Sequence, residues 1–385
     1  MKSIELFAGA GGLGIGLHEA GFRPARVIEW DGYCCDTIRE NQARGLDAVK
    51  EWKVTQGDVR DIDFRVHQGK VRLISGGPPC QPFSLGGKHR AQTDARDMFP
   101  QAIRAVRQAR PEAFIFENVK GLTRSSFRNY FEYIRLQLEY PEITVRRDED
   151  WSDHLARLEQ HHTSESRAGL SYRVVVQVLN AANYGVPQRR ERIFFVGFRE
   201  DLGTAWSFPA KTHSREALLL SQVNGDYWER HEIARSSRNI PSTAAGIRPD
   251  SIALNTKPWR TVRDALVGLP DPQLYPAASK AFLNHKYQPG ARSYPGHTGS
   301  PLDEPAKTLK AGVHGVPGGE NMLLRPDGSV RYFSVRESAR LQTFPDAFRF
   351  HGSWSETMRQ LGNAVPVQLA RIVGEHVARR LEEAS

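Results

Sequence analysis

The chain has 385 residues, of which 39% are hydrophobic and 25% charged, a composition that predicts two or three packed domains and excludes a disordered or fibrous protein. Lysine and arginine outnumber the acidic residues by 53 to 44, and the net charge of +9 favours a polyanionic partner. No apolar run is long enough to span a membrane, and the start of the chain lacks the apolar core of a secretory signal. We therefore expect a cytoplasmic protein with no membrane partner.

Strands and helices alternate through the first half of the sequence. We expect strands at 3–7, 26–30, up to Asp58, 71–75, 113–116, 172–179 and 192–198, with helices near 12–20, 36–44 and 98–109. Repeated strand–helix units predict an α/β fold, with a parallel sheet covered by helices on both faces. Residues 141–170 are highly charged, and we expect a solvated, partly helical insertion there.

The character of the sequence changes near residue 201. Residues 201–333 are rich in glycine, proline and serine and show little helical periodicity, which predicts a second, smaller and irregular domain. After it, Ser334 and Glu337 have the spacing of a capping box, and an apolar stripe over 367–381 predicts a final helix that docks on the first domain. We therefore predict one domain from 1–200 plus 334–385 and another from 201–333.

A glycine-rich loop follows the first predicted strand. Gly9-Ala10-Gly11-Gly12-Leu13-Gly14 matches G-x-G-x-x-G, and Glu29 ends the next strand. Glycines let the backbone approach a ligand closely, and the acid can bind ribose hydroxyls. The motif fits a nicotinamide cofactor as well as S-adenosylmethionine, so it does not choose between them. Asp58, after the third strand, is placed to accept a hydrogen bond from adenine, although an aspartate there more often caps a turn.

Polar side chains also stand at the ends of later strands. The strand that ends at Ser75 runs directly into Gly76-Gly77-Pro78-Pro79-Cys80, Glu117 follows an apolar strand, and Gln188-Arg189-Arg190-Glu191-Arg192 precedes another. Taken singly, Cys80 can be a buried filler, Glu117 a carboxylate paired with a lysine, and the basic run an exposed ion-pair cluster. Because the carboxyl ends of parallel strands form the ligand crevice, their order along the chain favours one shared site.

The three cysteines give no sign of a metal or a disulfide framework. Cys34 and Cys35 are sequence neighbours, and neither they nor Cys80 form a C-x-x-C pair. We therefore expect no metal site, and Cys80 is either a packed side chain or a reactive thiol.

Six sequence blocks resemble the DNA (cytosine-5)-methyltransferases, in the bacterial restriction–modification form. In chain order they are "IELFAGAGGLGIGLHEAGF" (4–22), "GGPPCQPFS" (76–84), "ENV" (117–119), "QRRER" (188–192), "RESARLQTFPDAF" (336–348) and "QLGNAVP" (360–366). The resemblance runs from residue 4 to about 375 outside the variable middle, and it implies a Rossmann-like methyltransferase domain with a smaller target-recognition domain. Thr308-Leu309 resembles the Thr-Leu pair of such recognition domains, whereas Glu5 stands where many members have aspartate.

The resemblance implies roles for the catalytic residues. Cys80 adds as a thiolate to carbon 6 of a cytosine flipped out of the duplex, which makes carbon 5 nucleophilic. Glu117 bonds the ring nitrogen N3 and the exocyclic amine. Arg192 and Arg190 hold the base's carbonyl oxygen and orient the loop, and Asn118 anchors the backbone of the site.

The resemblance also selects S-adenosylmethionine as the cofactor. Phe7 stacks on the adenine, Glu29 binds the ribose and Asp58 bonds the adenine amine. The full set of implied cofactor-binding residues is Phe7, Gly9, Gly11, Gly12, Glu29, Trp30, Asp58, Val59, Pro79, Asn363 and Val365.

Double-stranded DNA is the expected partner, with a restriction endonuclease as functional counterpart and a monomer as the default state. A tRNA cytosine-5 methyltransferase is an alternative, although the Cys-Phe-Thr tripeptide usual in those relatives does not occur in this sequence. A non-catalytic DNA-binding relative is another, which the presence of Cys80, Glu117 and Arg192 disfavours. A nicotinamide oxidoreductase leaves Pro-Cys-Gln and Glu-Asn-Val unexplained. The residues of 201–333 that read bases stay open.

Overall fold

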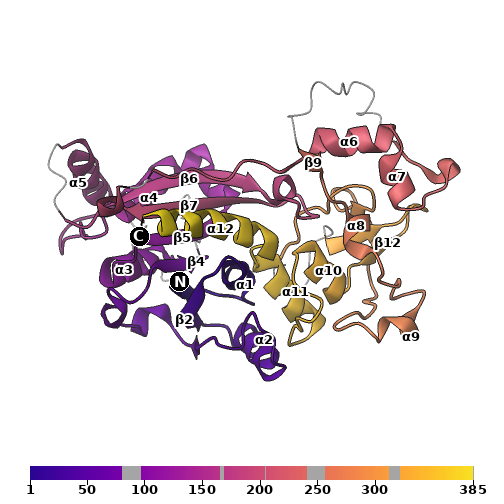
Figure 1. Cartoon of the computed structure of the whole chain (residues 1–385), viewed down its shortest axis with the longest axis horizontal. Coiled ribbons are helices and arrows are strands. Elements are labelled where there is room, and N and C mark those ends of the chain that lie inside the picture. The colour runs from indigo at the N-terminus through magenta and orange to yellow at the C-terminus, as the bar shows by residue number, and fades with distance from the viewer. Residues whose placement is uncertain (80–96, 165–168, 204, 241–255, 312–320, 385) are drawn as a thin grey trace. The chain divides into compact units, whose positions relative to one another are not determined.

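The computed structural model of the chain describes residues 1–79, 97–164, 169–203, 205–240, 256–311 and 321–384 (Figure 1). By its contacts the chain forms two compact units. The first unit comprises Met1–Leu179, Glu191–Phe208 and Ala370–Ser385, and the second comprises Asn180–Arg190 and Pro209–Leu369. Among the described helices, none combines the length and the apolar character that crossing a bilayer requires.

A seven-stranded sheet with the order β3-β2-β1-β4-β5-β7-β6 organises the first unit. Its strands are β1 (Lys2–Leu6), β2 (Arg23–Glu29), β3 (Val54–Gln56), β4 (Leu73–Gly76), β5 (Ala113–Val119), β6 (Tyr172–Asn180) and β7 (Glu191–Arg199). Strands β1 to β5 pair in parallel, as predicted. Strand β7 is antiparallel to β5, so the predicted parallel sheet contains a strand that runs against its neighbour. Only residues 181–190 join β6 to β7, which is too short for the crossover that a parallel neighbour needs.

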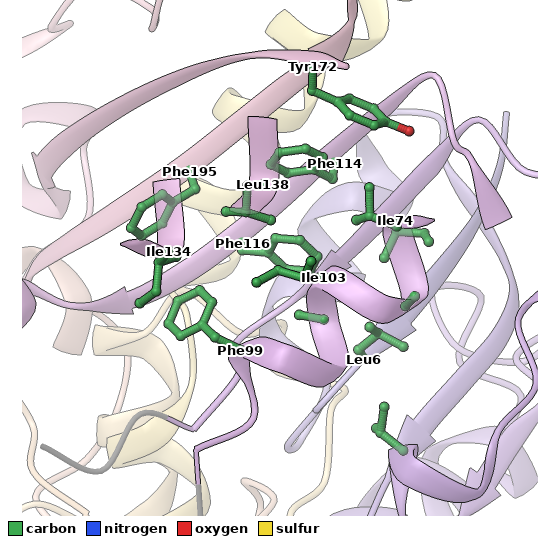
Figure 2. Close-up of a cluster of buried hydrophobic side chains, with 14 of the residues drawn as sticks. Leu6, Ile74, Phe99, Ile103, Phe114, Phe116, Ile134, Leu138, Tyr172 and Phe195 are labelled. Carbon is green, nitrogen blue, oxygen red and sulfur yellow. The ribbon is translucent and has the colours of Figure 1, made fainter. Parts of the chain in front are cut away.

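The helices of the first unit lie between these strands in the sequence, and the final helix joins them. They are α1 (Gly12–Glu19), α2 (Gly32–Ala43), α3 (Phe99–Ala109), α4 (Arg128–Glu139), α5 (Trp151–Thr163) and α12 (Val367–Glu383). In Figure 2, Phe99 and Ile103 of α3 and Ile134 and Leu138 of α4 gather around Phe116 of β5, and all five side chains are buried. This apolar cluster holds β5 in place, and β5 carries the polar residues of the predicted site at its end.

Two sequence predictions about the first unit are confirmed. The charged stretch 141–170 contains helix α5, although its Leu155 and Leu158 are buried, so the insertion is not solvated throughout. The final helix α12 docks on the first unit: Nη2 of Arg72 donates to the Leu381 carbonyl over 2.9 Å. A Cβ at Gly374 would lie 2.7 Å from the Leu17 side chain, so glycine permits the close approach of α12 to α1.

The second unit consists of short elements, in agreement with the irregular texture of its sequence. Its strands are β8 (His213–Ser214), β9 (Lys257–Pro258), β10 (Ser300–Pro301), β11 (Met322–Leu324) and β12 (Val330–Tyr332). Its helices are α6 (Arg215–Val223), α7 (Asp226–Arg230), α8 (Val262–Leu266), α9 (Pro276–Ser279), α10 (Val335–Leu341) and α11 (Trp354–Asn363).

Helix α10 begins with the predicted capping box. Ser334 Oγ accepts from the Glu337 backbone amide, and Glu337 Oε2 accepts from the Ser334 amide over 2.8 Å. Contacts place 334–369 in the second unit, whereas the sequence-based division assigned 334–385 to the first. The reason is local: Gln342 Nε2 donates to the Leu361 carbonyl over 2.6 Å, and α10 packs against α8 and α11. The division of the chain into a methyltransferase domain and a target-recognition domain stays a prediction.

A carboxyl group is buried in the sheet of the first unit. Glu5 on β1 lies directly opposite Ser75 on β4, and its Oε2 is hydrogen-bonded to Ser75 Oγ. Both residues are buried, and burial raises the pKa of Glu5 from 4.5 to about 8, an effect that the bond to Ser75 partly offsets. The carboxyl group is therefore largely protonated at neutral pH, and a neutral group at this position costs less to bury than a charge.

The Glu5 carboxyl makes the stability of the fold depend on pH. A carboxyl whose folded pKa is raised contributes stability below its unfolded pKa of 4.5, and that contribution is lost as pH rises through about 8. We expect Glu5→Gln, which is neutral at every pH, to lose less stability than the wild type between pH 5.5 and 9. Urea unfolding across this range measures the difference. The exposed Glu51→Gln serves as the matched control, and wild-type and Glu5→Gln curves that run parallel would contradict the burial argument.

Substitution of Gly76, the last residue of β4, tests the packing between β1 and β4. A Cβ at this position would overlap the Leu6 carbonyl oxygen of β1, whereas a Cβ at Gly57 meets no atom within 4 Å. We expect Gly76→Ala to lower the free energy of unfolding by about 1–3 kcal/mol through overpacking, and Gly57→Ala to change it by less than about 0.5 kcal/mol. Equal midpoints of urea unfolding for the two variants would refute this account of the β1–β4 contact.

Candidate active site

A buried ion pair joins the end of β5 to the start of β7. Nε of Arg192 lies 2.8 Å from Oε1 of Glu117, and both side chains are almost fully buried. The strand register pairs Glu117 with Phe194 and Val119 with Arg192, so the two charged side chains are diagonal neighbours on one face of the sheet. The structure thus brings two of the predicted catalytic residues together.

The segment that leads to Cys80 is fastened beside this pair. Asn118 Nδ2 donates to the Pro78 carbonyl over 2.8 Å, which fits the predicted anchoring role of Asn118. The Pro79 carbonyl accepts from the Met98 amide over 3.0 Å. A Cβ at Gly77 would lie 3.3 Å from Oε2 of Glu117, so the chain passes close to the carboxylate. Cys80, which follows Pro79, lies outside the described residues, and its role stays a prediction.

The glycine-rich loop bends sharply between β1 and α1. Gly9 and Gly11 have φ values of 55° and 90°, a left-handed conformation that glycine adopts without strain. Phe7, just before the loop, has φ of 54°, which is uncommon for a residue with a side chain. A Cβ at Gly9 meets no atom within 4 Å, whereas one at Gly11 would lie 3.0 Å from Trp52. The turn is therefore supported from the Trp52 side and open at Gly9, as a cradle for a ligand requires.

Glu29, at the end of β2, ties this loop to the start of α2. Its Oε2 accepts from the Gly9 amide and its Oε1 from the Asp31 amide, each over 2.7 Å. Burial raises the pKa of Glu29, and these two hydrogen bonds oppose that rise. Each oxygen retains a lone pair, so the carboxylate is able to accept bonds from the hydroxyls of a ribose. Beside it, Trp30 exposes 68% of its surface and offers an apolar face to a planar ring.

Asp58 behaves as a turn cap in this structure. Its carboxylate accepts from the amide and Nε of Arg60, each over 2.8 Å, and the Arg60 side chain lowers the pKa of Asp58. Val59 follows it in a short 3₁₀ turn and is buried. A turn-capping role accounts for the contacts that Asp58 makes in this structure, and its bond to adenine stays a prediction.

Three of the predicted site residues, Arg190, Asn363 and Val365, belong to the second unit. The guanidinium of Arg190 is fully buried and donates to the carbonyls of Leu309 and Gly362 over 3.0 and 2.8 Å. These contacts hold the Arg190 side chain in one orientation, and its expected role in orienting the loop stays a prediction. Its contact with a base, and the cofactor contacts of Asn363 and Val365, stay predictions.

Gln188 is a structural residue that sequence reasoning did not single out. Its Oε1 accepts from the Leu309 amide over 2.9 Å, and its Nε2 donates to the Leu341 carbonyl over 3.3 Å. Next to it, the Arg189 carbonyl accepts from Thr308 Oγ1 over 2.6 Å. The Thr308-Leu309 pair is thereby bound to the run 188–190. A glutamine at the head of a charged run resembles a surface residue, so no periodicity in the sequence marks it as buried.

Known proteins resemble this chain in sequence and in fold. The family model described as C-5 cytosine-specific DNA methylase matches residues 1–141 and 152–379. The Type II methyltransferase M.AplI of Arthrospira platensis is 31% identical over 380 residues, which cover 98% of this chain and 86% of the relative. M.PspPI of Psychrobacter sp. is 30% identical over 388 residues, 99% of this chain and 80% of the relative. The solved structure of S. pombe Dnmt2 methyltransferase has a TM-score of 0.58 at 16% identity, over 100% of this chain and 99% of its own, which shows the same fold.

Replacing Glu29 tests the cofactor cradle directly. In Glu29→Gln one oxygen becomes an NH₂ group that cannot accept from the Gly9 or Asp31 amide. We therefore expect S-adenosylmethionine to bind at least about 10-fold more weakly, or ~1.4 kcal/mol, by isothermal titration calorimetry. Glu51→Gln, an exposed change of the same kind, controls for charge, and a melting curve confirms that Glu29→Gln is folded. Unchanged affinity in folded Glu29→Gln would remove Glu29 from the cofactor site.

Proposed function

The chain belongs to the C-5 cytosine-specific DNA methylase family, and we propose that it performs the family reaction through a covalent bond between Cys80 and the target cytosine. Membership itself establishes the coarser activity: the enzyme methylates carbon 5 of cytosine in DNA and uses S-adenosylmethionine as the methyl donor. It also settles the choice between this cofactor and a nicotinamide, which the glycine-rich loop left open.

The Glu117–Arg192 pair is the observation that carries the proposal. Carbon 5 of cytosine is a weak nucleophile until a thiolate adds at carbon 6 and turns the ring into an enamine. Electron density moves toward N3 as the sulfur–carbon bond forms. A hydrogen bond that Glu117 donates to N3 in its protonated form therefore stabilises the ring. Arg192 lies 2.8 Å from the carboxyl group and holds it in one orientation, and its Nη1 donates to the Glu191 carbonyl. The remaining N–H groups of the guanidinium are donors for the base's carbonyl oxygen. The pair is therefore organised before the base arrives.

The remaining steps return the enzyme to its starting state. The enamine carbon 5 takes the methyl group from the donor's sulfonium, whose carbon–sulfur bond breaks. A base then removes the proton from carbon 5, and the electrons of that bond expel the Cys80 thiolate. The proline pair before Cys80 fixes the φ angles of the backbone that leads to the nucleophile. The Asn118–Pro78 hydrogen bond supports the same restriction.

In this proposal, residues of the first unit bind the ribose and the adenine of the donor. Its ribose hydroxyls bond to Glu29, whose carboxylate is already placed by the Gly9 and Asp31 amides. Its adenine lies near Phe7 and the exposed ring of Trp30. The open space at Gly9 fits a ligand that approaches the backbone of the turn. Asp58 bonds the adenine amine only through a carboxylate lone pair that Arg60 does not occupy.

Duplex DNA binds with its cytosine flipped out, and the second unit supplies the recognition of sequence. Flipping costs a few kcal/mol, which contacts to the DNA backbone have to offset, and the net charge of +9 fits that need. The relatives M.AplI and M.PspPI are Type II methyltransferases, which supports a cytoplasmic role beside a restriction endonuclease. A monomer suffices for methylating one strand at a time.

Trapping the covalent intermediate tests the nucleophile. Bisulfite sequencing of DNA from cells that express the enzyme first defines the target. A duplex with 5-fluorocytosine at that target cannot lose the substituent at carbon 5, so the wild type with S-adenosylmethionine should form a stable adduct at position 80, seen by mass spectrometry. Cys80→Ser should form none, and Cys34→Ser, which changes a buried thiol elsewhere, should react as the wild type does. An adduct in Cys80→Ser, or its absence in the wild type, would overturn the mechanism.

A further inference from the structure

The two backbone carbonyls that precede Cys80 are both hydrogen-bonded within the first unit. On β5, Nδ2 of Asn118 donates to the Pro78 carbonyl over 2.8 Å. The Met98 amide donates to the Pro79 carbonyl over 3.0 Å. The Pro79 carbonyl belongs to the planar peptide group that links Pro79 to Cys80. The bond from Met98 therefore restrains the direction in which the chain proceeds from Pro79 to the nucleophile.

Met98 stands at the start of helix α3, where the backbone amides have no partner within the helix. Its carbonyl accepts from the Ala102 amide over 3.1 Å, whereas its amide is left to bond the Pro79 carbonyl. Residues 80–96 lie between Pro79 and this turn in the sequence and outside the described part of the chain. The placement of the Pro79 carbonyl therefore depends on what holds the first turn of α3.

Asp97 fastens the first turn of α3 to α4. Its Oδ1 accepts from the Phe99 amide over 3.2 Å, and its Oδ2 accepts from the hydroxyl of Tyr130 on α4 over 2.6 Å. The Tyr130 side chain is buried, and a hydroxyl-to-carboxylate bond of this length is among the stronger hydrogen bonds in proteins. A continuous series of contacts thus runs from Tyr130 through Asp97 and Met98 to the Pro79 carbonyl.

We propose that Tyr130 is a positioning residue for the methyl transfer, because it holds the start of α3 and so lets the Met98 amide keep the Pro79 carbonyl in one orientation. Tyr130 acts on Cys80 only through this series of contacts, and its effect on the reaction rests on the covalent role of Cys80 proposed above. Without the hydroxyl, the half-buried Asp97 carboxylate can turn to water, and the first turn of α3 loses this bond to α4. A small displacement of a nucleophile costs much of the rate, because addition requires a near-attack geometry.

The rate of adduct formation with the 5-fluorocytosine duplex tests Tyr130. We expect Tyr130→Phe to form the adduct roughly 10-fold more slowly than the wild type, with unchanged affinities for the duplex and for S-adenosylmethionine. Tyr133→Phe is the matched control, because Tyr133 lies one turn further along α4 and is 7% exposed against 8% for Tyr130. Its hydroxyl bonds Nδ1 of His154 over 2.8 Å, away from α3. Both variants should lose stability in urea, but Tyr133→Phe should keep the wild-type rate.

Substitutions of Asp97 test the same series of contacts from its other side. Asp97→Asn retains a group that can bond both the Phe99 amide and the Tyr130 hydroxyl, so it should keep most of the wild-type rate. Asp97→Ala should slow adduct formation as Tyr130→Phe does. Combining Asp97→Ala with Tyr130→Phe should add little to either loss, because the two residues act as one unit.

Hydrogen exchange at the Met98 amide, followed by NMR, provides a readout that needs no activity. Exchange should be faster in Tyr130→Phe than in the wild type, and unchanged in Tyr133→Phe. A wild-type adduct rate in Tyr130→Phe would overturn the positioning role, as would equal losses of rate in the two variants. A failure of the covalent mechanism is distinct from both, since it would show as a missing adduct in the wild type, whatever the exchange at Met98.

Discussion

The candidate active site depends on one reversal of chain direction, that of β7 against β5. In a parallel neighbour, the first residues of the strand would lie at the opposite edge of the sheet from the end of β5. Because β7 is antiparallel, its second residue, Arg192, lies beside the end of β5 and meets Glu117 across 2.8 Å. The short connection over residues 181–190 requires β7 to run against β6, its other neighbour in the sheet. The strand that departs from the parallel pattern, β7, is thus the one that completes the Glu117–Arg192 pair.

Burial of the Glu117–Arg192 pair costs free energy and fixes the geometry of both side chains. Removing a carboxylate and a guanidinium from water carries a desolvation penalty that their attraction often only balances, so the pair is weak evidence for stability. Its value lies in fixed geometry, because each partner limits the rotamers of the other. The surrounding polar contacts, from Asn118 to Pro78 and from Lys120 to Glu191, restrain the same strand ends. The site is held by several short interactions rather than by one strong one.

Sequence patterns predicted the features that are local and periodic. The parallel strands β1 to β5, the glycine turn with Glu29 at the next strand end, the capping box of α10 and the docking of α12 all follow from short-range signals. The direction of β7 did not, because a strand carries no mark of its orientation. The burial of Arg190 and Gln188 was likewise hidden, since their partners are main-chain carbonyls and amides far away in the sequence, at residues such as Leu309 and Gly362.

The run 188–192 gives the two units a short and tightly anchored covalent connection. Arg190 is bound to carbonyls of the second unit, Arg192 is bound to Glu117 of the first, and Glu191 between them is paired with Lys120 at 2.8 Å. Two residues span at most about 7 Å when extended, so Arg190 cannot move far without displacing Arg192. Gln188 and Arg189 hold the Thr308-Leu309 segment beside the same run. The two predicted catalytic arginines are thus separated by Glu191 alone, and each is fixed by its own short contacts.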